Sequence, residues 1–191
     1  MIINMKNYYE ENADRYIEDT VNCDMSVQYN LFLKYINKGK ILDIGFGSGR
    51  DMRYFKTRGF VVEGLDPTET FINLVKDEFK VYKMSAEDLS IKDEYDGIWA
   101  CASLLHVNRV NLNDVFKRCS NALKNNGIMY VSFKYGDYEG IYKERYFNFI
   151  NEDILNEVIK DTNLSILEII YTDDVRKDRD DKWINVVLKK K

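Results

Sequence analysis

The chain has 191 residues and a formal net charge of −4, and it contains one histidine and one proline. This length suits a single domain around one hydrophobic core, and a hydrophobic content of 45% excludes a disordered chain. The negative charge argues against binding nucleic acid over a broad basic face. His106 is the single candidate for imidazole chemistry. We expect no metal site, because histidine-rich metal chemistry is excluded.

The cysteines indicate a reducing compartment, because Cys23, Cys101 and Cys119 are widely spaced and form no Cys-x-x-Cys pair. The N-terminal segment lacks the apolar region of a signal peptide. No apolar run reaches the length of a membrane span. We therefore expect a cytoplasmic protein with no membrane partner, present as a monomer or a homodimer.

The first two-thirds of the chain predict alternating helices and strands. A polar amphipathic helix over 7–21 is followed by a helix over 26–36 that ends before Gly39. The expected strands are 40–44, 60–65, 79–84, 95–101 and 128–134, and the helices between them are 50–58, 68–78 and 111–124. We expect Asn125, Asn126 and Gly127 to close the last of these helices. Such alternation is typical of a parallel sheet covered on both faces.

The last third is organised differently. It predicts an irregular aromatic stretch over 135–150, a helix over 152–161, and two apolar runs over 164–171 and 183–188. These runs are expected to pair antiparallel across a long charged segment. We interpret that segment as a solvated loop. The alternative is that Arg176 or Arg179 reaches a ligand pocket.

The segment ILDIGFGSGRD (41–51) is the most informative part of the chain. It follows the first predicted strand and begins a helix, where a glycine loop binds a nucleotide or an anion. Gly45 permits a tight turn, Gly47 lets a ligand approach the backbone, and the helix start offers free N–H groups. Asp66 ends the second strand, where an acid accepts both hydroxyls of a ribose. Pro67 is expected to begin the next helix and to orient Asp66.

Two cofactor classes compete for this loop. A dinucleotide fingerprint needs its third glycine at the position of Arg50, whereas the glycine stands at Gly49. Asp43, at the entrance to the loop, is unfavourable beside a pyrophosphate. It suits the amino group and sulfonium of S-adenosylmethionine. A nicotinamide-dependent reductase is therefore disfavoured, and a loop that merely turns the chain is the structural alternative.

Five segments resemble the class I S-adenosylmethionine-dependent methyltransferases, in the order and at the spacing of that family. They are ILDIGFGSGRD (41–51), GLDPT (64–68), SAEDL (85–89), YDGIWACASLLHV (95–107) and LKNNGIMYVSFKYG (123–136). The segment YYEENADRYIEDT (8–20) also resembles the lid helix of small bacterial members, some of them called tellurite-resistance-like. Phe46 stands where many members have cysteine or alanine, and Asn125-Asn126-Gly127 replaces a frequent Lys-Pro-Gly turn.

The resemblance implies a doubly wound α/β fold. It implies a mostly parallel, Rossmann-like sheet of seven strands with an antiparallel last strand. One methyltransferase domain over 1–191 would comprise a helical lid (1–38), a cofactor-binding half (39–134) and an acceptor-side segment (135–191).

The resemblance also implies the residues that contact S-adenosylmethionine. Asp43 and the glycine loop would face its methionine half, Asp66 its ribose, and Ala86 and Glu87 its adenine. The end of the fourth strand would lie beside the donor methyl group. The full expected set is Tyr9, Tyr16, Asp43, Gly45, Phe46, Gly47, Gly49, Arg50, Asp66, Pro67, Ala86, Glu87, Ala100 and Cys101.

Methyl transfer from a sulfonium needs mainly alignment and exclusion of water, because the donor is already activated. A general base is needed only when the acceptor arrives protonated. His106 follows the fourth strand and is the candidate base. Its alternative role is to satisfy a local backbone group.

The expected acceptor-binding residues are Lys134, Tyr135, Arg145 and Tyr146, which follow the fifth strand. Arg145 lies among aromatic residues and could hold a carboxylate or another anion. We expect a small-molecule methyltransferase without a nucleic-acid partner. An RNA or protein methyltransferase and a non-catalytic cofactor-binding or partner-regulating protein are the alternatives.

Overall fold

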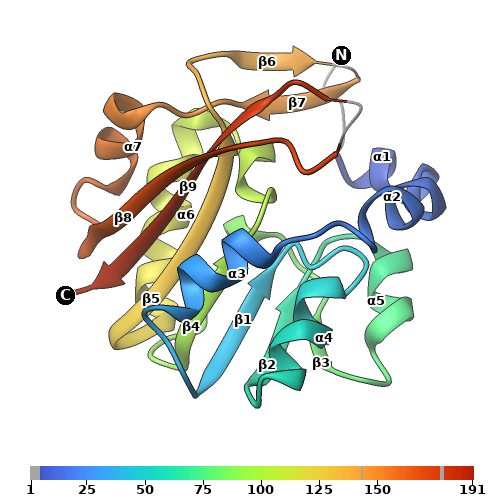
Figure 1. Ribbon diagram of the computed structural model, residues 1–191, viewed down its shortest axis with the longest axis horizontal. Helices are drawn as coiled ribbons and strands as arrows, with labels where there is room; N and C mark the ends of the chain where they lie inside the picture. The colour runs from blue at the N-terminus through green and yellow to red at the C-terminus, as the bar shows by residue number, and fades with distance from the viewer. Residues whose placement is uncertain (1–4, 143, 177–178) are drawn as a thin grey trace.

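A seven-stranded sheet runs through the molecule in the order β3-β2-β1-β4-β5-β9-β8 (Figure 1). The computed structural model describes residues 5–142, 144–176 and 179–191. Strands β3, β2, β1, β4 and β5 are parallel, and β9 is antiparallel to both of its neighbours. The strands are β1 (Lys40–Ile44), β2 (Val61–Leu65), β3 (Lys80–Tyr82), β4 (Tyr95–Ala100), β5 (Leu123–Lys134), β8 (Leu164–Asp173) and β9 (Lys182–Lys190). The predicted α/β sheet with an antiparallel last strand is confirmed.

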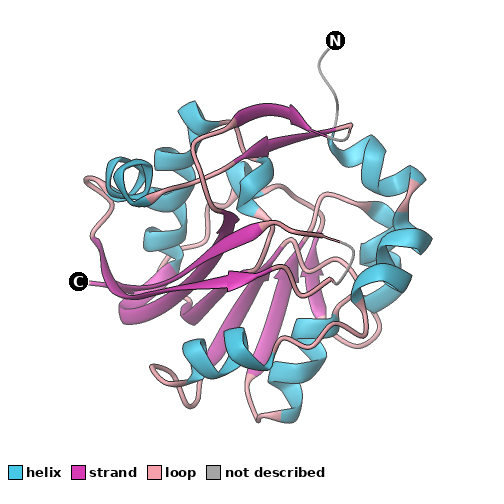
Figure 2. Ribbon diagram, turned by 45° about the horizontal axis from the view of Figure 1, so that its top comes forward, coloured by secondary structure: helices cyan, strands magenta, loops and turns pink. Residues whose placement is uncertain are grey.

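Helices cover both faces of this sheet (Figure 2). One face packs against α3 (Ser26–Leu33), α4 (Arg50–Thr57) and α5 (Glu69–Val75). The other packs against α6 (Arg109–Ala122) and α7 (Glu152–Ile159). Because successive strand residues point to opposite faces, Ile41 joins the first core and Leu42 the second. No described helix is long and apolar enough to span a membrane.

The N-terminal segment forms two helices, α1 (Met5–Glu11) and α2 (Ala13–Thr20), and not the single predicted helix. Asn12 interrupts it, with φ −119° and ψ 17°. Its side-chain amide donates to the carbonyl of Tyr8 at 2.8 Å. Asparagine readily makes such local bonds to the backbone, which explains the break.

The expected end of α6 at Asn125-Asn126-Gly127 is wrong. The helix stops at Ala122, and Leu123 already pairs with Tyr95 in the sheet. The next paired residues are Gly97 and Ile128, so residues 124–127 leave the ladder. A Cβ on Gly127 would lie 2.8 Å from the Lys124 carbonyl oxygen, so this tight excursion requires a glycine. The turn residues therefore form a bulge inside β5.

The sequence predicted an irregular structure for the aromatic stretch over 135–150, and this prediction is wrong. The stretch contains an antiparallel hairpin of β6 (Glu139–Tyr142) and β7 (Arg145–Asn148). Arg109, at the start of α6, attaches this hairpin to the domain. Its guanidinium donates to the Asn148 side chain at 2.9 Å and to the Phe149 carbonyl at 3.1 Å. The hairpin contacts α1 and the 3-10 helix η2 (Leu104–His106). It thereby brings residues after β5 next to the N-terminal helices.

Candidate active site

Two cavities adjoin near the carboxyl ends of the parallel strands. The glycine-loop cavity, of about 180 Å³, is lined by the loop after β1, the end of β2 and the 3-10 helix η1 (Ala86–Asp88). The basic cavity, of about 130 Å³, is lined by α3, β5, β9 and the segment after β8. Four residues line both cavities and separate them: Tyr9, Tyr16, Ala102 and His106. A molecule in either cavity can therefore contact the same wall.

The glycine loop requires glycine at the two positions that face its cavity. Gly45 and Gly47 have φ of 70° and 52°, which side chains rarely adopt. A Cβ on Gly45 would lie 2.5 Å from the Cβ of Ser103, and one on Gly47 would lie 2.8 Å from the Tyr16 ring. The backbone of Gly45 and Gly47 therefore lines the cavity, and the neighbouring Ser103 and Tyr16 side chains leave no room for a Cβ atom.

Asp66 closes the loop from the end of β2. Its carboxylate accepts hydrogen bonds from the backbone N–H groups of Gly47, at 3.2 Å, and Thr68, at 2.9 Å. Burial raises the pKa of this carboxyl group, which is 5% exposed. The carboxylate retains lone pairs for a diol on its cavity side. Pro67 lies before the N-cap residue Thr68 and does not begin α5, so that expectation is wrong.

Four buried side-chain atoms of the described residues lack a hydrogen-bond partner: Asp43 Oδ2, Ser103 Oγ, Gln28 Oε1 and Arg145 Nε. Ser103 lines the glycine-loop cavity, and Gln28 and Arg145 line the basic cavity. Buried polar groups are normally hydrogen-bonded, so such exceptions point to ligand contacts. With Asp66 and the free loop backbone, the unpartnered Ser103 hydroxyl fits a ligand that carries hydroxyl and charged groups, as S-adenosylmethionine does.

The structure separates the expected cofactor residues into three groups. The glycine-loop cavity is lined by Tyr9, Tyr16, Gly45, Gly47, Asp66, Pro67, Ala86 and Glu87. The basic cavity is lined by Arg50 and Cys101. Neither cavity is lined by Asp43, Phe46, Gly49 or Ala100, and Phe46 packs in the core beside Gly64. Direct contacts to one ligand are therefore expected from the first group.

Arg50 is held by a buried network that the sequence analysis missed. Its guanidinium donates two bonds to Asp51, at 2.6 and 3.0 Å, and one to the Thr20 carbonyl. Asp51 also accepts bonds from the hydroxyl of Tyr29, at 2.5 Å, and the indole of Trp99, at 2.8 Å. The Asp51 side chain thus joins α3, α4 and β4 beneath the loop. The adjacent Arg-Asp pair was the available signal for this network.

His106 bridges the N-terminal helices and the hairpin. Its Nδ1 lies 2.7 Å from the Tyr146 carbonyl, which can only accept, so Nδ1 carries the proton. Its Nε2 is then the acceptor of the Tyr9 hydroxyl, at 2.8 Å. Burial and the nearby cations Arg145 and Lys134 together lower the pKa of His106 to about 4, although the hydrogen bond to the Tyr146 carbonyl opposes this shift. The ring is therefore neutral near pH 7, with a lone pair directed at the wall between the cavities.

We expect the stability of the protein to fall as the pH falls from about 6.5 to 4, because His106 binds a proton more readily in the unfolded chain. The contribution lost is at most about 3 kcal/mol, less any part screened by solvent at the cavity wall. Urea unfolding of the wild type and of His106→Gln between pH 6.5 and 4 isolates the contribution of His106 to the free energy of unfolding. If the free energy of unfolding falls with pH equally in the wild type and the variant, His106 does not have a lowered pKa in the folded protein.

The basic cavity receives Lys134 and Arg145 of the expected acceptor-binding residues, but not Tyr135 or Tyr146. The Tyr135 hydroxyl donates to Glu152 at 3.2 Å on the surface, and the Tyr146 hydroxyl bonds to Glu139. Tyr146 contributes instead through its backbone, which orients His106.

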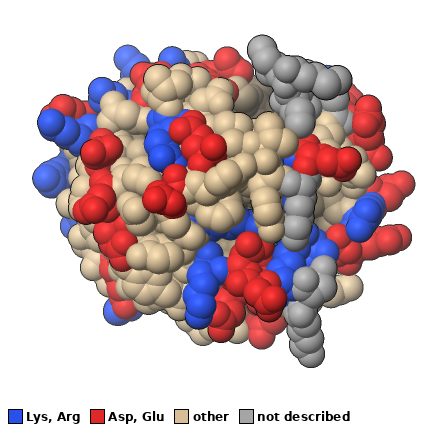
Figure 3. Space-filling view, turned by 90° about the horizontal axis from the view of Figure 1, so that it is seen from above, with Lys and Arg blue, Asp and Glu red and all other residues tan. Residues whose placement is uncertain are grey.

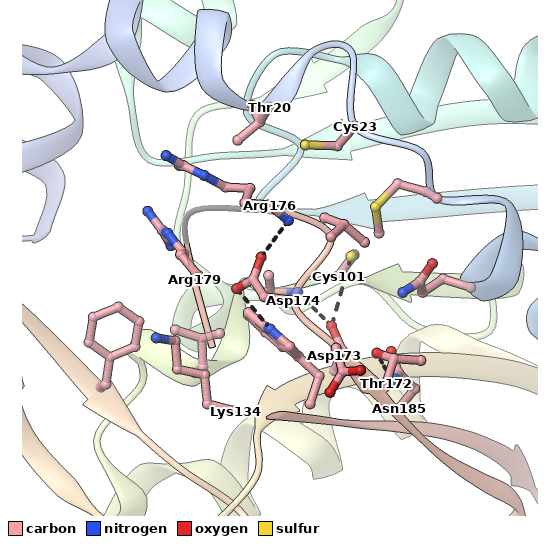
Figure 4. Close-up of a pocket in the computed structure, with 18 of the residues that line it drawn as sticks. Thr20, Cys23, Cys101, Lys134, Thr172, Asp173, Asp174, Arg176, Arg179 and Asn185 are labelled. Atoms are coloured by element: carbon pink, nitrogen blue, oxygen red, sulfur yellow. Dashed lines mark hydrogen bonds between the residues drawn. The ribbon is translucent and has the colours of Figure 1, made fainter. Parts of the chain in front are cut away.

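The charged segment after β8 is part of the cavity and not only a solvated loop, since Arg176 and Arg179 both line it. Figure 4 shows their side chains extending in the same direction, with Asp174 held by the backbone of Arg176. The cavity also has lining residues that the sequence analysis did not identify, among them Gln28, Tyr130, Ser132, Trp183 and Asn185. They come from α3, β5 and β9, so only the folded sheet brings them together.

The comparisons with known proteins agree with this geometry. Residues 41–127 match the family model described as "Methyltransferase domain". No curated protein matches the chain in sequence. Solved structures match it in fold at low identity.

One similar structure is the 1,6-didemethyltoxoflavin-N1-methyltransferase of Burkholderia thailandensis, with 1,6-didemethyltoxoflavin and S-adenosylhomocysteine bound. It has a TM-score of 0.78 and 17% identity, over 96% of this chain and 84% of that one. A Methanosarcina mazei S-adenosylmethionine-dependent methyltransferase has a TM-score of 0.74 and 17% identity, over 85% of this chain and 97% of that one.

The [4+2]-cyclase SpnF is also similar, with a TM-score of 0.75 and 14% identity, over 97% of this chain and 94% of that one. The fold is therefore shared by proteins of different named activities. Residues 41–127 of the chain are thus similar to a methyltransferase domain, and the chain shares the fold of solved methyltransferase structures.

Proposed function

We propose that this protein transfers the methyl group of S-adenosylmethionine to a small molecule bound in the basic cavity. The observation that carries this proposal is the shared wall of Tyr9, Tyr16, Ala102 and His106 between the two cavities. A donor in one cavity and an acceptor in the other would meet there. The named substrate of the Burkholderia relative, a small heterocycle, supports an acceptor of this size. The N-terminal resemblance further supports membership of the small bacterial methyltransferases.

The glycine-loop cavity would hold the donor. Asp66 would accept the ribose hydroxyls, and the backbone at Gly45 and Gly47 would lie against the methionine half. Ala86 and Glu87 border the other end of the cavity, where adenine would lie. Asp43 lies on β1, just before the loop, and lines neither cavity. When bound, the cofactor supplies a methyl group that is electrophilic because it is attached to a sulfonium.

The Tyr9–His106 pair would accept the proton that a protonated acceptor loses. S-adenosylmethionine held at Asp66 and the glycine loop would supply the methyl group and would keep the electron pair of its carbon–sulfur bond. The acceptor proton passes to the Tyr9 oxygen as the Tyr9 proton moves to His106 Nε2, which leaves an imidazolium. Tyr9 and Tyr16 also cover the wall and exclude water. An unchanged turnover in His106→Ala would assign catalysis to alignment alone.

The charge distribution on the face above the cavities favours a small-molecule acceptor and not an RNA acceptor. Seen from the side of the hairpin, Lys and Arg side chains are interspersed with Asp and Glu and form no continuous basic face (Figure 3). RNA-binding proteins usually gather positive charge along the path of the phosphates. The basic cavity, of about 130 Å³, is also lined by Tyr130, Phe147 and Trp183, which suits a compact ligand.

The test is methyl transfer from labelled S-adenosylmethionine into separated metabolite, RNA and protein fractions of a cell extract. We expect label in the metabolite fraction, and none there with the Asp66→Ala variant. Label confined to RNA or protein would overturn the small-molecule assignment. Binding of the cofactor without label in any fraction would favour the non-catalytic alternative.

A further inference from the structure

The guanidinium of Arg145 has no anionic partner in the described part of the chain. Its Nε is buried and unbonded, and its Nη1 lies 3.3 Å from the hydroxyl of Tyr9. The group is held between two rings, 5.4 Å from the centroid of Tyr8 and 4.9 Å from that of Phe147. Arg145 is half-buried, and a buried guanidinium N–H without an acceptor is costly. Arg145 is thus fixed in place at the cavity with unused donors.

The other charges of the basic cavity are mostly neutralised within the protein. The ion pairs among its described residues are Arg50–Asp51, Lys134–Asp181, Arg176–Asp19 and Lys182–Asp173, and Asp174 accepts from the indole of Trp183. Arg179 lines the same cavity and forms no ion pair with a described residue. Arg145 and Arg179 are thus two cations, and Asp174 one anion, that line the cavity without an ion pair to a described residue, which leaves a small excess of positive charge.

The other lining residues of the basic cavity indicate the chemistry of the part of the ligand that does not contact Arg145. Tyr130, Phe147 and Trp183 supply aromatic surface, and the unpartnered Gln28 Oε1 accepts a donor. Arg145 and His106 are both bonded to the Tyr9 hydroxyl, so an anion on Arg145 lies next to the wall where the methyl group would be transferred.

We infer that the acceptor carries a carboxylate, which the Arg145 guanidinium binds, on an apolar body enclosed by the aromatic walls. This inference rests on the proposed function, because it names the substrate class of the same site. A guanidinium presents paired donors that match the two oxygens of a carboxylate. The carboxylate also offsets one of the cations that disfavour protonation of His106. An acidic acceptor therefore makes the candidate base stronger when it binds.

The test uses matched carboxylates and carboxamides as probes: acetate and acetamide, benzoate and benzamide, indole-3-acetate and indole-3-acetamide. Each is titrated calorimetrically into protein saturated with S-adenosylhomocysteine, at constant ionic strength. We expect at least one carboxylate to bind roughly 10- to 100-fold more tightly than its amide. Arg145→Gln should remove that preference, and Arg145→Lys should restore part of it. Arg58→Gln, at an exposed arginine outside both cavities, is the matched control.

The inference is overturned if no carboxylate binds more tightly than its amide, or if the preference survives in Arg145→Gln. The affinity for S-adenosylhomocysteine is measured first in every variant. If the wild-type protein does not bind S-adenosylhomocysteine, the proposed function itself is contradicted. Intact cofactor binding without a carboxylate preference would contradict only the substrate class.

Discussion

Replacing Asp66 with alanine is expected to weaken the binding of S-adenosylhomocysteine by at least about 100-fold, the effect of losing two hydrogen bonds to a charged group. The carboxylate lies at the cavity with lone pairs free for the ribose hydroxyls. It also holds the Gly47 N–H at 3.2 Å and the Thr68 N–H at 2.9 Å. The variant therefore loses both the ligand contact and the support of the loop. Calorimetric titration measures the affinity.

Asp114→Ala serves as the control for Asp66→Ala. Asp114 is an exposed carboxylate on α6 that pairs with Arg118 at 2.9 Å and lines neither cavity. Its removal should leave the affinity unchanged. Urea unfolding of both variants separates a loss of ligand contact from a loss of folded protein. Wild-type affinity in a folded Asp66→Ala variant would remove the ribose assignment.

Replacing Asp51 with alanine is expected to lower the free energy of unfolding by about 3–5 kcal/mol, as when one partner of a buried ion pair is removed. Asp51 is 7% exposed and accepts bonds from Arg50, Tyr29 and Trp99. Alanine would leave a guanidinium, a hydroxyl and an indole N–H without their acceptor in a closely packed region.

Urea unfolding measures the effect of Asp51→Ala, and Asp51→Asn is the matched comparison. Asparagine keeps one acceptor oxygen and the side-chain volume, so its loss should be smaller. Removal of an exposed pair, as in Asp114→Ala, should cost less than about 1 kcal/mol. A loss in Asp51→Ala no larger than in that control would show that the network does not stabilise the fold.

The sheet and the glycine loop could be predicted because local patterns determine them. Apolar runs alternating with amphipathic segments allow few topologies, and the loop between β1 and α4 demands glycine at Gly45 and Gly47. The hairpin of β6 and β7 could not be predicted in this way. Its aromatic residues show no clear alternation, and Arg109, far earlier in the chain, holds it in place.

The cavity beside the glycine loop could be predicted for the same reason, whereas the contacts of Tyr9 and Arg145 could not. Asp66 directly follows β2, so the parallel register of β1 and β2 brings it beside the loop after β1. The contact between Tyr9 and His106 joins residues 97 positions apart, and that between Tyr9 and Arg145 joins residues 136 apart. These contacts depend on the packing of α1 against β7, for which no local pattern exists. The predicted ligand contacts of Arg50 and Tyr135 did not take account of their hydrogen-bond partners, Asp51 and Glu152.

The most direct test of the central claim is calorimetric titration of purified, cofactor-free protein with S-adenosylhomocysteine, S-adenosylmethionine and NAD. We expect saturable binding of the two S-adenosyl compounds at one site per chain and no binding of NAD. Absence of binding by both S-adenosyl compounds, or preferential binding of NAD, would contradict the assignment of the glycine-loop cavity.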